Sequence, residues 1–170
     1  VAPGGVNLAE AAERADALAA AGDEKALATL RSEWGDEIEA VARDGDYRRR
    51  ALAYRALAQF RFRQKRELLR RGLDDESPAV RGAALIALES LSRDHPGDVN
   101  AYRGLLRELA ARDPNVAVRR LAVLCFRNGT PGQDTIRLLE GIADDDEDDP
   151  EVRKTARSVA LLLAKRARTR

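Results

Sequence analysis

The sequence has few of the residues on which several protein classes depend. Its 170 residues include one cysteine, one histidine and no methionine, and aromatic side chains make up only 4%. A single cysteine excludes a disulfide framework, and one histidine beside one cysteine cannot form a zinc site. The longest apolar runs, such as residues 159–164, are far shorter than the roughly 18 residues of a membrane-spanning helix. We therefore expect no membrane segment, no metal and no cofactor.

An excess of charge of one sign is also missing. The 30 basic and 29 acidic side chains nearly cancel, and 44% of the residues are apolar, which together exclude an intrinsically disordered chain. The abundant Ala, Leu, Arg and Glu favour helices, and no stretch alternates polar and apolar residues over a strand's length. No secretory signal pattern opens the sequence, so we expect an all-α cytoplasmic protein.

Helix boundaries can be recognised near the N-terminus. Asn7 and Glu10 have the spacing of a capping box, which predicts a helix that ends before Gly22. Asp23 is placed to begin the next helix, and Gly45 with Asp46 marks a turn. Further amphipathic helices are predicted over residues 64–73, 100–111 and 133–143, with a breaker-rich loop at residues 94–97.

A repeat appears in the second half of the chain. Pro78, Pro114 and Pro150 follow one another at intervals of 36 residues, each after a serine or aspartate. Such a pair predicts a capped helix with proline at its first position, where the missing N–H costs nothing. A Val-Arg pair follows each proline, although the middle copy has two extra residues before it. The three pairs are Val80-Arg81, Val118-Arg119 and Val152-Arg153, and a weaker copy has Arg50 at the matching position.

This pattern resembles that of HEAT repeats, including the short bacterial kind also called PBS-lyase-like. The resemblance covers residues 24–168 and is best at Ser77–Leu88. It implies a right-handed α-solenoid of about four antiparallel helix pairs with an N-terminal capping helix, because short helix pairs bury their apolar faces by stacking. We expect one domain over residues 1–170, with the cap at 1–22, a degenerate repeat at 23–61, and clearer repeats at 64–92, 98–127 and 132–168.

The repeated arginines have a structural interpretation. In HEAT repeats, such an arginine and an acidic residue of the preceding turn usually link neighbouring repeats. Arg81, Arg119 and Arg153 are the arginines, and Asp75, Asp113 and Asp149 are suitably placed acids. We therefore do not count this ladder among the binding residues.

The resemblance also implies that the second helix of each pair lines a concave side. The exposed stripe projected on these helices is basic at intervals, with apolar side chains between. We expect a non-catalytic scaffold or adaptor that binds an acidic, phosphorylated or extended protein segment there. The leucine-rich end at Leu161–Leu163 predicts a further contact, self-association included. The stripe residues are Arg55, Ile86, Arg120, Leu124, Arg127, Lys154 and Arg157.

Two other functions are left as alternatives. The basic segment 48–71 has Tyr54, Phe60 and Phe62 interleaved, a mixture that suits binding of a nucleic-acid backbone. A lyase-type HEAT protein is the other alternative, for which no catalytic residue is predicted. The basic residues proposed for nucleic acid are Arg49, Arg61, Arg63, Lys65, Arg66 and Arg70.

The remaining groups with chemical potential favour ordinary roles. Residues 144–149 are all acidic but lack the offsets and glycine of a calcium loop, so we expect a solvated turn. Cys125 falls at a position where the repeat needs a small buried side chain, and His95 lies in a loop.

Overall fold

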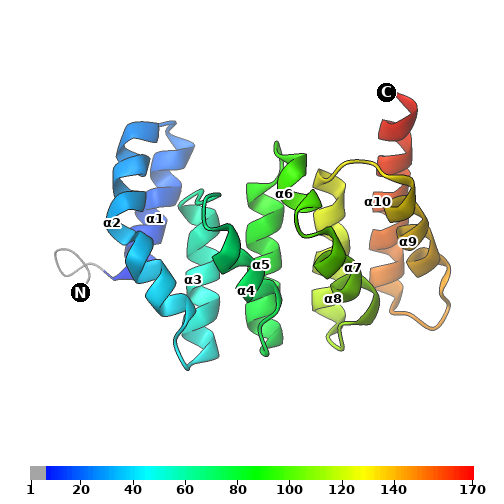
Figure 1. The fold of residues 1–170 in the computed structure, drawn as a ribbon, viewed down its shortest axis with the longest axis horizontal. Coiled ribbons are helices and arrows are strands. Elements are labelled where there is room, and N and C mark those ends of the chain that lie inside the picture. Colours follow the sequence, from blue (N-terminus) through cyan, green and yellow to red (C-terminus); the bar gives the residue numbers. More distant parts are fainter. Residues whose placement is uncertain (1–6) are drawn as a thin grey trace. The chain divides into compact units, whose positions relative to one another are not determined.

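A computed structural model describes residues 7–170, and every regular element in that range is a helix (Figure 1). The all-α prediction is therefore confirmed. The helices form two compact units, which meet in sequence between Ala87 and Leu88. Among the described residues, none of the helices combines the length and apolar character needed to cross a membrane.

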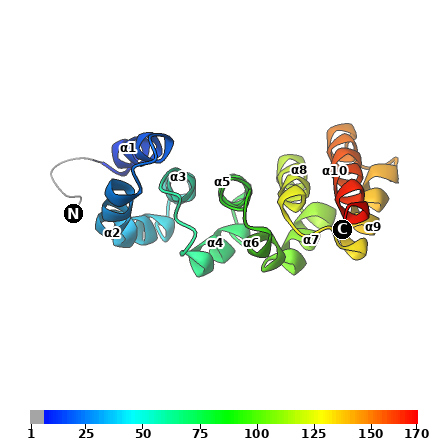
Figure 2. The same ribbon diagram turned by 90° about the horizontal axis from the view of Figure 1, so that it is seen from above.

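The first unit is a set of antiparallel helices in two layers. Helices α1 and α3 lie in one layer, and α2 and α4 lie in the other (Figure 2). Trp34, Tyr54 and Leu57 are among the side chains buried between the layers. The elements are α1 (Leu8–Ala20), α2 (Glu24–Ala42), α3 (Tyr47–Gln59), α4 (Arg66–Leu73) and α5 (Pro78–Leu91), whose last residues belong to the second unit.

The second unit repeats the two-layer arrangement. Helices α8 and α10 pack side by side in one layer, and α7 and α9 form the other (Figures 1 and 2). Leu106, Leu139 and Leu163 are fully buried in its core. The elements are α6 (Pro96–Asn100), α7 (Arg103–Arg112), α8 (Val116–Cys125), the short 3₁₀ helix η2 (Phe126–Asn128), α9 (Gln133–Asp144) and α10 (Pro150–Arg168).

The predicted caps of the first two helices are present. The Asn7 side chain accepts a hydrogen bond from the Glu10 N–H at 2.9 Å, and the Glu10 carboxylate accepts from the Asn7 N–H. Gly22 follows α1 with a φ of 72°, a conformation that glycine adopts without strain. Asp23 then caps α2 by accepting from the Ala26 N–H at 3.1 Å.

The prediction of proline at the first helical position is confirmed at Pro150 and wrong at Pro114. Helix α8 begins at Val116, and Asn115 caps it by accepting from the Val118 N–H. The two extra residues of this copy thus lie before the cap, where they do not change the register of the helix. Consequently, the repeated arginine is the fourth residue of its helix every time, and these arginines are Arg50 in α3, Arg81 in α5, Arg119 in α8 and Arg153 in α10.

The single helix predicted over residues 100–111 is wrong. The chain forms the short α6 from Pro96, within the predicted loop, and then starts α7 at Arg103. Pro96 suits the first position of a helix because it needs no hydrogen-bond partner for its nitrogen. Val99 and Tyr102 are both buried, so their packing fixes the break between α6 and α7.

Candidate functional site

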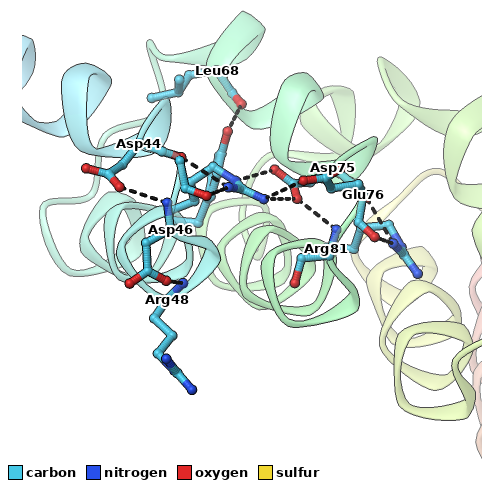
Figure 3. Close-up of polar contacts among 11 residues, drawn as sticks. Asp44, Asp46, Arg48, Leu68, Asp75, Glu76 and Arg81 are labelled. Carbon is cyan, nitrogen blue, oxygen red and sulfur yellow. Dashed lines mark hydrogen bonds and ion pairs between the residues drawn. The ribbon is translucent and has the colours of Figure 1, made fainter.

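The repeated arginines join turns to helices within each unit. In the first unit, Arg50 donates two hydrogen bonds to the Asp75 carboxylate at 2.9 and 3.0 Å. It donates two more to the backbone carbonyls of Asp44 and Gly45, both at 3.0 Å. Figure 3 shows Asp44 and Asp75 on opposite sides of this group of polar contacts. The side chains of Arg50 and Asp75 are each only 10% exposed, so this ion pair is part of the core.

Polar groups next to this pair also form hydrogen bonds inside the first unit. Burial alone would raise the pKa of Asp75, but hydrogen bonds from Arg50 and from the Ser77 N–H outweigh it and lower that pKa. The buried Tyr54 hydroxyl donates to the Leu68 carbonyl at 2.9 Å, and burial raises the pKa of Tyr54 to about 12. The Arg50–Asp75 pair and the Tyr54 hydroxyl are thus held by contacts inside the first unit.

The same arginine makes comparable contacts in the other repeats. Arg81 donates to the Asp75 and Glu76 carbonyls, and Arg119 donates to the Asp113 carbonyl. Arg119 also binds the Asp148 carboxylate at 3.0 Å. The predicted structural role of the arginine ladder is therefore confirmed.

The predicted acid at Asp149 has a different task. Asp149 caps α10, accepting from the Glu151 and Val152 N–H groups. Its neighbour Asp148 binds Arg119 instead, because a carboxylate turned toward the start of α10 cannot also reach α8. Asp146 pairs with Arg153 at 2.8 Å. The acidic turn is thus used for capping and ion pairs, and no acidic, histidine or cysteine cluster suited to a metal ion occurs within residues 7–170.

Cys125 and His95 have the ordinary surroundings expected of them. Cys125 is fully buried, and burial raises the pKa of its thiol, so the reactive thiolate form is disfavoured. His95 lies directly before α6, where its backbone N–H donates to the Ser92 carbonyl.

The predicted partner-binding residues of the first unit are both exposed. Arg55 lies on α3, and Ile86 on α5 has 49% of its surface exposed, although it is a large apolar residue.

In the second unit, two hydrogen bonds bring the predicted residues of α8 and η2 to one side of α10. Arg120 donates from Nε to the Thr155 hydroxyl at 3.2 Å, and Arg166 donates to the Arg127 carbonyl. Thr155, Leu162 and Arg166 are seven and four residues apart, so they share one side of α10. We call this surface the α8–α10 face, formed by Arg120, Leu124, Arg127, Leu162 and Arg166.

The basic side chains of the α8–α10 face differ in whether a carboxylate pairs with them. Arg127 pairs with Glu89 at 2.6 Å. Burial alone would raise the pKa of Glu89, but hydrogen bonds from Arg93 and Arg127 outweigh it and lower that pKa to about 2. Within the part of the chain that the structure describes, neither Arg120 nor Arg166 is paired with a carboxylate. The face therefore presents two unmatched guanidinium groups beside the partly exposed Leu124 and Leu162.

Two predicted residues of α10 lie outside the α8–α10 face, and the face has members that were not among the predicted binding residues. Arg157 donates to the Ala143 carbonyl at 3.0 Å, which places its guanidinium at the end of α9 rather than on the face. Lys154 is exposed, two helical turns before Leu161. Leu162 was predicted as part of the leucine-rich end and not of this face, and Arg166 was not predicted, although their spacing from Thr155 along α10 could have indicated them.

Of the three aromatic residues in the basic segment of the first unit, Phe62 is partly exposed and lies under Lys65. Tyr54 and Phe60 are fully buried. Arg61 pairs with Asp16 at 3.2 Å, and Lys65 pairs with Glu39 at 2.5 Å. The other residues proposed for nucleic acid also take part in contacts, and these are Arg49, Arg63, Arg66 and Arg70. Tyr54 and Phe60 are therefore core residues and not a stacking surface.

Antiparallel helix pairs whose second helices carry an arginine at the same position define an α-helical repeat protein. Residues 36–108 match the family model described as HEAT repeats, which supports the HEAT-repeat resemblance of the sequence. A search of curated proteins found no match. HEAT repeats generally mediate protein–protein interactions and are typically non-catalytic.

Proposed function

We propose that this chain is a non-catalytic protein-interaction module whose α8–α10 face binds an acidic or phosphorylated, extended segment of another protein. The observation that supports this most directly is the pairing of two unmatched guanidinium groups, Arg120 and Arg166, with two partly exposed leucines. A surface of this kind offers both charge and apolar contact to one ligand.

The chemistry of arginine fits such a ligand. A guanidinium can donate two parallel hydrogen bonds to a carboxylate or a phosphate, which gives direction as well as attraction. Leu124 and Leu162 could cover an apolar side chain between the acidic ones, and each apolar square ångström removed from water contributes about 25 cal/mol. The ligand is therefore expected to alternate acidic and apolar residues.

The face is also held in place before any ligand binds. Arg120 is tied to α10 through Thr155, and Arg166 is tied to η2 through the Arg127 carbonyl. Arg127 itself is positioned by Glu89 and needs no ligand to balance its charge. A surface that is already ordered loses little conformational entropy on binding.

The proposal is tested by capture from a lysate of the native host, followed by mass spectrometry. Immobilised wild-type chain is compared with the Arg120→Glu/Arg166→Glu double variant and with Leu162→Glu. We expect one set of proteins to be retained by the wild type and lost with both variants, and the retained segment to be rich in Asp, Glu or phosphorylated residues. Arg127 is left unchanged because reversing its charge would place two carboxylates together at Glu89.

The matched control reverses two exposed charges away from the face. Arg48→Glu/Arg49→Glu changes the net charge by the same amount, and both positions are exposed on α3. If this control loses the same proteins as the face variant, the attraction comes from overall charge and the proposal fails. Arg55, Ile86 and Lys154 stay predicted contact residues, and single changes there are tested by the same capture.

A further inference from the structure

The first and last helices of the chain carry opposite charge. Residues 7–42 contain nine acidic and three basic side chains, whereas residues 150–170 contain one acidic and seven basic side chains. The net charges of these two segments are thus equal in size and opposite in sign. Opposite potentials of this kind steer two surfaces together in solution.

One side of α10 is apolar and basic without being covered. Leu161 is 66% exposed, the highest value of any large apolar side chain among the described residues. Lys154, Leu161, Lys165 and Arg168 are seven, four and three residues apart, so they share one side of the helix. We call this side the α10 outer face. It differs from the side with Thr155 and Leu162, which contributes to the α8–α10 face.

A groove between α1 and α2 has an apolar floor and lies on the acidic α1–α2 segment. Its volume is about 380 Å³, and Leu18, Ala26 and Leu30 give it an apolar floor. Asp23 and Glu33 line its edge together with Arg14 and Lys25. One turn beyond these lining residues, Glu10 extends the acidic character along α1, and Glu37 does so along α2.

We propose that the α10 outer face of one copy docks in the α1–α2 groove of a second copy of this chain. Leu161 enters the groove over Leu18 and Ala26, while the basic residues on either side of Leu161 face the glutamates along the groove. The basic residues 43–73 are a poorer match for the groove, because no large aliphatic side chain is exposed in that segment.

This contact is heterologous, since two different surfaces meet. Each added copy leaves one groove and one α10 outer face unoccupied, so the assembly can grow beyond a dimer. A contact made by one helix face lies at the small end of interface size, below roughly 1,200 Å², and we expect association only at micromolar or higher concentration.

The test is sedimentation velocity on the full chain over a range of about 5 to 500 µM, where weak interfaces become occupied. We expect the average mass to rise steadily above 18.7 kDa with concentration. At a salt concentration of about 0.5 M, where exposed charges are strongly screened, the mass should return toward the monomer. A monomer at every concentration in low salt would overturn the proposal.

Two blocking variants identify the surfaces. Leu161→Glu places a charge on the α10 outer face, and Ala26→Lys places one in the groove. Each variant alone should be monomeric, but an equal mixture should form a 1:1 heterodimer and nothing larger, because one intact surface of each kind remains. If Ala26→Lys still associates while Leu161→Glu does not, α10 pairs with itself and the head-to-tail arrangement is wrong. Circular dichroism verifies that both variants are folded.

Leu162→Glu separates this inference from the proposed function. It should self-associate like the wild type while losing the captured partner, whereas Leu161→Glu should keep the partner and lose self-association. If Leu162→Glu also abolishes self-association, the assignment to the α10 outer face is wrong.

Discussion

Basic side chains serve different purposes in the two units of this chain. Residues 43–73 of the first unit contain eleven basic and three acidic side chains, yet Arg50, Arg61 and Lys65 are bound to carboxylates of the same unit. On the α8–α10 face of the second unit there are fewer basic residues, but neither Arg120 nor Arg166 has a carboxylate partner among residues 7–170. The density of basic residues in the sequence is therefore a poor guide to the charge available to a ligand.

The contrast also holds between two neighbouring residues. Arg119 binds the Asp113 carbonyl and the Asp148 carboxylate, and its side chain is 17% exposed. Arg120 is exposed and donates a hydrogen bond to the Thr155 hydroxyl. One residue along a helix is a rotation of about 100°, which is enough to turn one arginine toward the turns and the next toward solvent.

The largest effect on stability is expected when Arg50, which is buried and paired with Asp75, is replaced. Arg50→Ala leaves the Asp75 carboxylate buried without its ion-pair partner, and the loss of a partner from a buried pair costs about 3–5 kcal/mol. We expect a decrease of this size in the free energy of unfolding, measured by urea denaturation. Arg49→Ala is the matched control, because Arg49 is 57% exposed and its pair with Asp44 is worth at most about 1 kcal/mol. Equal losses of unfolding free energy from the two variants would contradict the distinction between buried, paired arginines and exposed ones.

A smaller difference is expected between the two neighbours on α8. Arg119→Ala removes a partly buried pair and should lower the free energy of unfolding by about 2–3 kcal/mol. Arg120→Ala should change it by no more than about 0.5 kcal/mol, as for other surface substitutions. Urea denaturation of both variants measures the difference, and a larger loss from Arg120→Ala would show that Arg120 is structural.

Many of these structural roles could be predicted from the sequence. The capping box at Asn7 and the arginine ladder follow from residue types at fixed spacing, which local geometry determines. The offsets along the second helices also predicted that Arg120 and Leu124 would be open. Such patterns specify the side of a helix on which a residue lies.

The failures have one physical cause, which is that spacing does not specify the neighbour that a long side chain reaches. Arg157 lies near the predicted stripe but extends to the Ala143 carbonyl of α9. Asn115 takes the capping role predicted for Asp113, because two inserted residues move the start of α8. Tyr54 and Phe60 resembled a stacking platform in the sequence, and only the packing of α3 shows that they are core.

A modest effect on stability is expected at low pH, where protonation of Glu89 weakens its ion pair with Arg127. The pKa of Glu89 is about 2 in the folded chain, below its ordinary 4.5. The pair with Arg127 is therefore at full strength above about pH 4.5, and its contribution to stability is lost as the pH falls through about 2. Urea denaturation between pH 2 and 6 should show a shallower pH dependence for Glu89→Gln than for the wild type. Identical slopes would mean that Glu89 does not contribute to the acid sensitivity.

The central claim is that the α8–α10 face, and not the denser basic segment, holds the cations that bind a partner. The most direct measurement is fluorescence anisotropy of a labelled peptide of alternating glutamate and leucine, titrated with three forms of the chain at low salt. We predict that Arg120→Glu/Arg166→Glu weakens the affinity at least about tenfold, equivalent to about 1.4 kcal/mol, while the charge-matched Arg48→Glu/Arg49→Glu stays within about twofold of the wild type. Equal weakening by both double variants, or a larger loss from the α3 variant, would contradict the account.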